Sequence, residues 1–221
     1  MKPLVIWGHG QIALTAAHYA TAWGYGEVAA FAVDREYVPA DSGSGPPVVA
    51  GDELVERFPP ARYAAFVAVG YQSLNGLRAD LVDRLRGLDY ELVNIINPEA
   101  RPLVTTGVNC LVIPGETHLE PFVTLGDDVF VWNAVTLSHY VEVGDHTWLS
   151  NGTTVGGNAV IGSRCMVGLN VTVNNRVNVG NGCLLGSGAL VTRDVPTGEA
   201  VVPAATPVTP GGANRIQALL R

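Results

Sequence analysis

Two patterns of hydrophobic and polar residues divide the chain near residue 100. Before it, short apolar runs, which predict strands, alternate with stretches whose apolar residues recur every three or four positions, as in helices. We expect strands at Leu4–Trp7, Val28–Val33, Ala64–Val69 and Leu92–Ile96, and helices at Gln11–Ala22 and Ser73–Leu88. Strands that alternate with helices favour a small parallel α/β sheet.

After residue 100 an aliphatic residue recurs at every sixth position, from Ile113 to Val191. A small or β-branched residue follows four places after each, from Thr117 to Val195, and turn-forming Gly, Asn, Asp and Ser fill most positions between. Three such six-residue faces make one coil that stacks on the next, so residues three repeats apart share a column, as Leu125, Val143, Ile161 and Val179 do. This period predicts a left-handed parallel β-helix built from hexapeptide repeats.

The two patterns give a domain plan. We expect an α/β domain over residues 1–98, an all-β left-handed β-helix over residues 99–210 and a short C-terminal helix within residues 211–221. One outward column of the β-helix is apolar at every level and should be covered: Phe130, Trp148, Met166 and Leu184. A cyclic homotrimer or the N-terminal domain can cover it, and we expect the trimer.

Composition narrows the classes of function. A net charge of −7 speaks against a protein that binds nucleic-acid phosphates. No apolar run reaches the roughly 20 residues that span a bilayer, and three Cys residues do not make a disulfide framework. The interpretation is a cytoplasmic protein. Cys165 and Cys183, which lie one coil apart in an inward column, are expected to be small core residues.

A glycine-rich turn follows the first strand. Gly8, His9 and Gly10 join that strand to the first helix, and Asp34 follows the second strand, where a carboxylate can accept from a ribose or a base. The helix N-terminus favours a phosphate, so the pattern predicts a Rossmann-like, nucleotide-binding domain. The sheet is short for a dinucleotide, and a dehydrogenase has no support beyond this turn.

His139 lies at a predicted corner of the β-helix, and Gly157 lies one coil later in the same column. A histidine beside an exposed backbone N–H can act as a general base next to a donor for a carbonyl oxygen. The alternative is a solvated turn histidine. A metal site is disfavoured, because the spacings of His118, His139 and His146 do not match one coil and these residues do not stack in one column.

A glycine turn of this kind, followed by hexapeptide repeats and Ser138-His139, resembles the hexapeptide-repeat sugar acyltransferase family. That family includes sialic acid O-acetyltransferases, UDP-4-amino-sugar N-acetyltransferases and GDP-perosamine N-acetyltransferases. The likeness extends over nearly the whole chain, including the segments Phe66–Tyr71, Asn75–Arg78 and Asn94–Pro98.

The resemblance implies a homotrimer that uses acetyl-CoA as cosubstrate, without a metal. His139 would take the proton of the attacking amine or hydroxyl, and Gly157 would donate its N–H to the thioester carbonyl. It further implies that CoA lies along Gly157, Leu169, Gly186 and Ser187, and that the nucleotide-linked sugar lies at Gly8, His9, Gly10 and Asp34.

The chain departs from these relatives at Tyr140, where the amino-sugar N-acetyltransferases have a carboxylate that supports the histidine. Glu142 or Asp145 is the expected substitute. We therefore expect N-acetylation of a nucleotide-linked amino sugar. Alternatives are transfer to a sugar hydroxyl or of a longer acyl group and, from another class, a non-catalytic trimeric nucleotide-binding scaffold.

Overall fold

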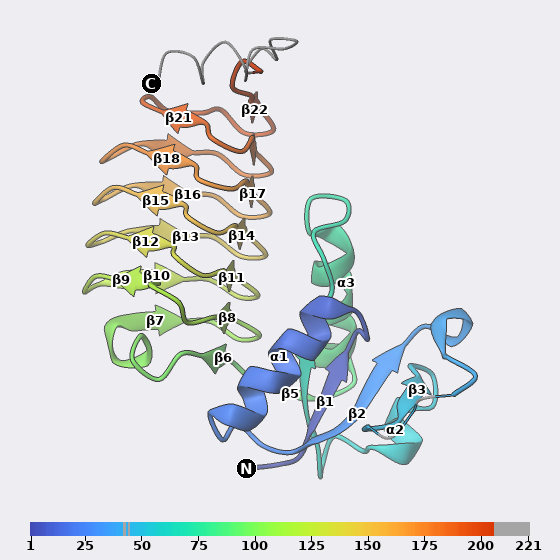
Figure 1. Cartoon of the computed structure of the whole chain (residues 1–221). Helices are drawn as coiled ribbons and strands as arrows, with labels where there is room; N and C mark the ends of the chain where they lie inside the picture. Colours follow the sequence, from blue (N-terminus) through green and yellow to red (C-terminus); the bar gives the residue numbers. More distant parts are fainter. Residues whose placement is uncertain (42, 44, 206–221) are drawn as a thin grey trace, which may run out of the picture.

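The computed structural model describes residues 1–41, 43 and 45–205. The expected C-terminal helix lies outside these residues. The chain has two parts: an α/β part at its N-terminal end and a tall stack of short strands that stands beside it (Figure 1).

The α/β part contains a five-stranded parallel sheet in the order β3-β2-β1-β4-β5. Its elements are β1 (Leu4–Trp7), α1 (Gln11–Ala22), β2 (Val28–Val33), a short 3₁₀ turn (Arg35–Tyr37), β3 (Val48–Ala50), α2 (Leu54–Arg57), β4 (Ala64–Val67), α3 (Gly76–Gly87) and β5 (Glu91–Leu92). The expected parallel sheet is confirmed, while β3 and α2 were not predicted. Helix α3 begins later than expected, because Ser73, Leu74 and Asn75 adopt left-handed backbone conformations.

Alternation along β1 separates two hydrophobic cores. Leu4 and Ile6 face α1, whose small residues Ala13, Ala16 and Ala20 allow close approach. Val5 and Trp7 face the opposite side, where they pack with residues of α2 and α3. The sheet is therefore buried on both faces, as expected for parallel strands.

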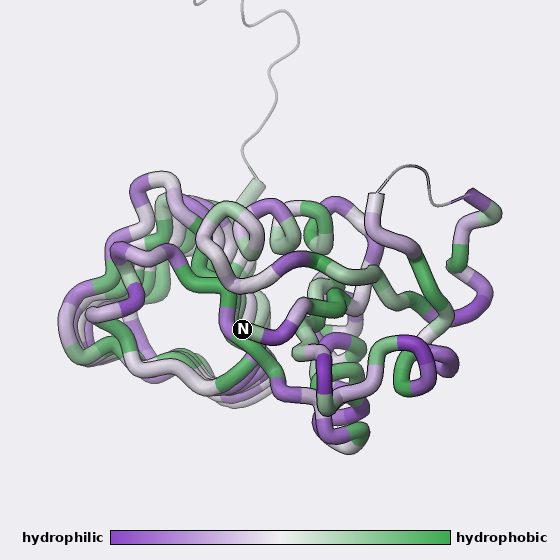
Figure 2. The backbone as a smooth tube through the Cα atoms, turned by 90° about the horizontal axis from the view of Figure 1, so that it is seen from below, coloured by the Kyte–Doolittle hydropathy of each residue, from purple (hydrophilic) through white to green (hydrophobic). Residues whose placement is uncertain are grey.

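The second part is a β-helix of three parallel sheets, seen along its axis in Figure 2. We call the face that packs against the α/β part the domain face. It carries β6 (Ile95–Ile96), β8 (Leu111–Val112), β11 (Phe130–Val131), β14 (Trp148–Leu149), β17 (Met166–Val167), β20 (Leu184–Leu185) and β22 (Ala200–Val201). We call the second face the threonine face, after Thr136, Thr154 and Thr172 on its middle strands. It carries β9 (His118–Leu119), β12 (Thr136–Leu137), β15 (Thr154–Val155), β18 (Thr172–Val173) and β21 (Leu190–Val191). The third face, which a 3₁₀ turn (Arg101–Leu103) precedes, carries β7 (Val104–Thr106), β10 (Val123–Leu125), β13 (Glu142–Val143), β16 (Val160–Ile161) and β19 (Asn178–Val179).

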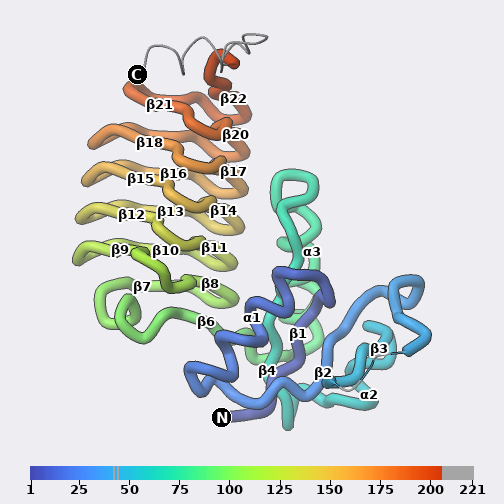
Figure 3. The backbone as a smooth tube through the Cα atoms, viewed as in Figure 1, coloured from blue at the N-terminus to red at the C-terminus, as the bar shows by residue number. Residues whose placement is uncertain are grey.

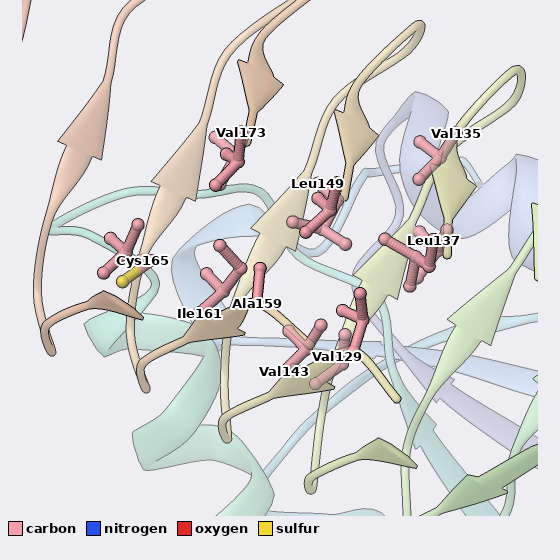
Figure 4. Packing of buried hydrophobic residues seen from close by; sticks show 14 of the residues in the cluster. Val129, Val135, Leu137, Val143, Leu149, Ala159, Ile161, Cys165 and Val173 are labelled. Atoms are coloured by element: carbon pink, nitrogen blue, oxygen red, sulfur yellow. The ribbon is translucent and has the colours of Figure 1, made fainter. Parts of the chain in front are cut away.

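The inward columns form the core of the β-helix. Partners such as Val143 and Ile161 lie one coil apart on adjacent strands that pair in register. Their side chains point into the interior with those of the adjoining corners, as Figure 4 shows for Leu137, Leu149 and Ala159. Cys165 and Cys183 are buried there as free thiols, so their predicted place in the core is confirmed.

The expected phase is wrong at the first aliphatic position. Val112, not Ile113, enters the core of the β-helix, and Ile113 packs in the cluster that joins the two parts. The reason is one additional residue in this coil: the step from Val112 to its partner Val131 is one residue longer than the step from Val131 to Leu149. A shift of one residue reverses which side chains face inward.

The expected strand Leu92–Ile96 is divided between two sheets. Leu92 pairs with Ala65 in the α/β sheet, and Ile96 pairs with Val112 on the domain face. Asn94, which lies between them, donates to Thr106 Oγ1 and the Gly107 carbonyl, and its Oδ1 accepts from the Cys110 N–H. These bonds attach the crossing segment to the first coil.

The apolar outward column lies on the domain face, against the α/β part. Phe130 is fully buried, Trp148 nearly so and Met166 partly, in one cluster with Phe66 and Ile6. The expectation that a trimer covers this column is wrong for its first three levels, because the same chain covers them. Figure 3 shows the α/β part beside the lower coils. No helix within the described ranges is long and apolar enough to cross a membrane.

Candidate active site

His139 lies at the corner between the threonine face and the third face, which we call the histidine corner (residues 120–122, 138–141, 156–159 and 174–177). It follows β12 and precedes Tyr140, whose left-handed backbone conformation turns the chain. The His139 side chain is more than half exposed. Its carbonyl accepts from the N–H of Asn158 in the coil above, which fixes the backbone beneath the ring.

Glu120, in the coil below, holds His139 at two points. Its Oε2 accepts from the His139 backbone N–H at 2.7 Å and lies 3.0 Å from Nδ1 of the ring. These hydrogen bonds lower the pKa of Glu120, first through the ring and then through the backbone N–H. A carboxylate on Nδ1 fixes the tautomer that leaves Nε2 as the proton acceptor.

The expected supports of His139 are therefore corrected. Glu142 points to solvent from β13 and contacts neither ring nitrogen, and Asp145 Oδ1 instead accepts from the Asp127 N–H at another corner. Sequence reasoning missed Glu120. The signal was available, because Glu120 precedes Ser138 by one full coil and so stacks directly beneath the Ser138-His139 pair.

Gly157 lies against the outer half of the His139 ring. A Cβ added at Gly157 would stand 2.7 Å from both Nε2 and Cε1, so only glycine fits there without moving the ring. Among the described residues, the Gly157 carbonyl accepts from the Arg176 N–H, whereas the Gly157 N–H has no partner. The structure thus brings together the predicted base and the predicted donor.

The other residues expected to contact CoA lie at the opposite edge of the threonine face. Leu169 and Ser187 are exposed there, Gly186 is partly exposed, and the Leu169 N–H donates to Ser187 Oγ at 3.1 Å. The threonine face separates this edge from Gly157, so the structure does not bring the four into one contact. The structure places Gly157 at one edge of the threonine face and the other three residues at its opposite edge.

The residues expected to contact the nucleotide line a cleft of about 830 Å³ in the α/β part. Gly8, His9, Gly10 and Asp34 all contribute to it, at the carboxyl ends of β1 and β2. Gly8 has φ +119°, and a Cβ there would meet the Ala68 carbonyl at 2.6 Å, so the turn requires glycine. Gly10 precedes α1 with open space beside it, which leaves the helix N-terminus accessible.

Asp34 is held by a neighbouring cation. Arg84 of α3 lies 3.5 Å from Asp34 Oδ1, and its guanidinium stacks on the Trp7 ring at 4.5 Å. Half of the Asp34 side chain remains exposed to the cleft. His9 is exposed, with its ring 5.2 Å from that of Phe31.

The cleft and His139 lie on different sides of the chain. All lining residues of the cleft precede residue 82, whereas the α/β part packs on the domain face and His139 occupies the corner opposite that face. Among the described residues, no group of three or more His, Cys, Asp or Glu side chains is arranged to hold a metal ion.

Known structures share this architecture over nearly its whole length. PerB from Caulobacter crescentus, solved with CoA and GDP-perosamine, is 27% identical, with 94% of this chain and 98% of that chain covered and a TM-score of 0.80. The acetyltransferase domain of PglB from Neisseria gonorrhoeae, solved with acetyl coenzyme A, is 24% identical, with 94% and 99% covered and a TM-score of 0.80. WeeI from Acinetobacter baumannii is 18% identical, with 92% and 97% covered and a TM-score of 0.71.

No family model matches the chain, and no curated protein matches it in sequence. The structural comparisons nevertheless confirm the resemblance to hexapeptide-repeat sugar acetyltransferases that the sequence predicts.

Proposed function

We propose that this chain is an acetyltransferase that moves the acetyl group of acetyl-CoA to an amino group of a nucleotide-linked amino sugar. The observation that carries the proposal is His139, held by Glu120 and packed on Gly157, in a fold shared with the CoA-bound and GDP-perosamine-bound PerB. Structures of perosamine N-acetyltransferase with one histidine replaced by asparagine or alanine support a histidine base.

The arrangement supports one chemical step. The acceptor amine attacks the thioester carbonyl carbon, a C–N bond forms and the C–S bond breaks. His139 Nε2 takes the amine proton and passes it to the leaving CoA sulfur. The Gly157 N–H donates to the carbonyl oxygen as negative charge develops on it, and Glu120 stabilises the imidazolium through Nδ1.

The substrates take separate places in the proposal. CoA lies along the threonine face from Gly157 to Leu169, Gly186 and Ser187. The nucleotide binds in the cleft at Gly8, His9, Gly10 and Asp34, in a domain of Rossmann-like type.

The proposal includes the arrangement of the fold. The β-helix is left-handed, and the domains divide near residue 98.

A homotrimer completes the site in this proposal. One copy holds the nucleotide on the side away from its own His139, so a symmetric neighbour has to supply the base. The three free, buried Cys residues are compatible with a reducing compartment, and we place the reaction in the cytoplasm.

The direct test is release of the CoA thiol from acetyl-CoA with UDP-, dTDP- and GDP-linked 4-amino sugars as acceptors. We expect turnover with one of them and none with the corresponding 4-hydroxy sugars. Thermal melting with each ligand gives an independent measure, since a ligand at a hundred times its Kd adds about 2.7 kcal/mol to stability. No shift with acetyl-CoA and no thiol release would refute the proposal.

A further inference from the structure

Two exposed aromatic rings lie beside His139 at the histidine corner. Phe122 and Tyr140, one coil apart, stack with ring centroids 4.7 Å apart and planes at 18°, and 63% and 52% of these residues is exposed. The Tyr140 ring stands 6.1 Å from the His139 ring and perpendicular to it. No part of the proposed mechanism uses either ring.

Aromatic residues are unusual at these positions. Most corners of the β-helix turn through a residue with positive φ. Apart from Phe122 and Tyr140, the non-glycine residues in this role are Asn109, Glu116, Asp128, Ala134, His146, Asn158, Arg164, Asn170 and Arg176. A left-handed conformation costs a bulky side chain more than it costs Asn. Phe122 and Tyr140 adopt it with φ +70° and +58°, so local backbone preference does not explain their presence.

A small hollow lies beneath the pair. It has a volume of about 230 Å³ and is lined by Pro102, Leu103, Val104, Thr105, Pro121 and Phe122. Complete ligand pockets hold roughly 300–1,000 Å³, so this hollow fits part of a ligand. Polar atoms and apolar side chains both line it.

Polarity changes along the histidine corner. Below the His139 level lie Glu120 and Phe122, Tyr140 lies at that level, and above it lie Asn158, Asn175 and Arg176. Arg176 is exposed and has no carboxylate partner among the described residues. A cationic ligand is favoured at the lower end and an anionic one at the upper end.

We infer that Phe122, Tyr140 and the hollow beneath them form the subsite for the sugar ring of the acceptor and select its amino group. This inference rests on the proposed function. A sugar amine arrives largely as ammonium, which is attracted to an aromatic face within about 6 Å. It releases one proton to solvent before the neutral amine attacks, and His139 takes the second proton during the attack. The hollow, lined by polar and apolar atoms, receives one edge of the sugar ring, while Gly157 keeps the thioester on the other side of His139.

The test replaces both rings by asparagine, which Asn109, Asn158 and Asn170 supply at other positive-φ positions of the β-helix. Phe122→Asn with Tyr140→Asn keeps a side chain suited to positive φ and removes the aromatic faces. We expect KM for the amino-sugar nucleotide to rise about tenfold, with KM for acetyl-CoA unchanged. Tyr140→Phe retains the stack and should stay within about twofold of the wild type.

Arg164→Asn is the matched control, because Arg164 has positive φ at a different corner and is exposed. It should leave both KM values unchanged. Size-exclusion chromatography and thermal melting accompany every variant.

An unchanged acceptor KM in the double variant overturns the subsite. So does a rise in the acetyl-CoA KM alone, or a change of oligomeric state, since the rings would then contact CoA or a neighbouring copy. If the wild type transfers acetyl to no amino acceptor, the proposed function fails and the subsite fails with it.

Discussion

Two histidine–carboxylate pairs occupy different corners of the same β-helix, with the same contact distance. His139 Nδ1 lies 3.0 Å from Glu120 Oε2, and His146 Nδ1 lies 3.0 Å from Asp128 Oδ2. In each pair the carboxylate comes from the coil below. Their surroundings differ: 56% of the His139 side chain is exposed, against 14% of that of His146.

The Asp128 carboxylate is shared among several partners at the junction of the two parts. Arg78 Nε donates to it at 2.8 Å and Asn109 Nδ2 at 2.7 Å, and all three side chains are fully buried. The Arg78 guanidinium also lies 4.2 Å from the centre of the Phe130 ring. Burial lowers the pKa of Arg78, against the opposing effect of Asp128.

The comparison shows that an imidazole–carboxylate contact alone does not identify a catalytic base. The His146 pair joins the corner to a buried arginine of α3 and so connects the two parts. The His139 pair is open to solvent and has a glycine against the outer nitrogen of its ring. Solvent access and the adjacent glycine distinguish the His139 pair from the buried His146 pair. Each of the following predictions changes one feature of the two pairs.

The largest expected effect separates the two histidines. His139→Asn should lower kcat roughly 10²–10⁴-fold, because the general base is lost, with little change in melting temperature. His146→Asn should leave kcat near wild type and lower the melting temperature by a few degrees, as about 1 kcal/mol does in a chain of this size. Thiol release and thermal melting of both variants test this. Equal losses of kcat would contradict the distinction.

The next effect concerns the buried pair. Arg78→Met should destabilise the fold by about 3–5 kcal/mol, since Asp128 is left buried without its cation. Arg86→Met is the matched control: Arg86 is also on α3 and pairs with Asp127 at 2.7 Å, but half exposed. Its loss should cost about 0–1 kcal/mol. Urea unfolding measures the free energy of unfolding of both variants. Similar losses of stability would show that burial does not set the strength of this junction.

Features that repeat along the sequence could be predicted, and features made by the stacking of particular side chains could not. The six-residue period identified the columns of the β-helix, and alternating patterns identified β1, α1 and β2 with the bounds that the structure gives. The period failed at Ile113, where one additional residue reverses the alternation.

The candidate site shows the same limit. His139 and Gly157 share a column, so their contact followed from spacing. Glu120 shares its column with Ser138, so spacing could have placed it beneath the Ser138-His139 pair. Only the structure shows that its side chain reaches the His139 ring one position further along. The Arg78–Asp128 pair joins residues from the two parts of the chain, so no periodicity indicates it.

A smaller loss of activity is expected from Gly157→Ala. Gly157 does not have positive φ, so the backbone accepts alanine, but the new Cβ at 2.7 Å from Nε2 must displace the His139 ring. A base displaced by about 1 Å costs roughly 10² in rate. We expect kcat to fall by that factor, with the melting temperature and the KM for the nucleotide sugar retained. A fully active variant would show that the ring does not need its position on Gly157.

The smallest effect isolates the charge on the carboxylate that supports His139. Glu120→Gln keeps an oxygen for Nδ1–H and removes the negative charge that stabilises the imidazolium, so we expect kcat to fall about tenfold.

The same substitution should change how the stability of the fold depends on pH. The hydrogen bonds from His139 place the pKa of Glu120 below its usual value of 4.5, so at pH values above 4.5 the ionised carboxylate stabilises the folded state. This stabilisation is lost as the pH falls through the lowered pKa of the folded state. The melting temperatures of the wild type and Glu120→Gln should therefore differ most near neutral pH and converge in acid. A difference in melting temperature that stays constant from neutral to acid pH would mean that the Glu120 charge does not act through His139. The exposed His139–Glu120 pair would then have no electrostatic role that distinguishes it from the buried His146–Asp128 pair.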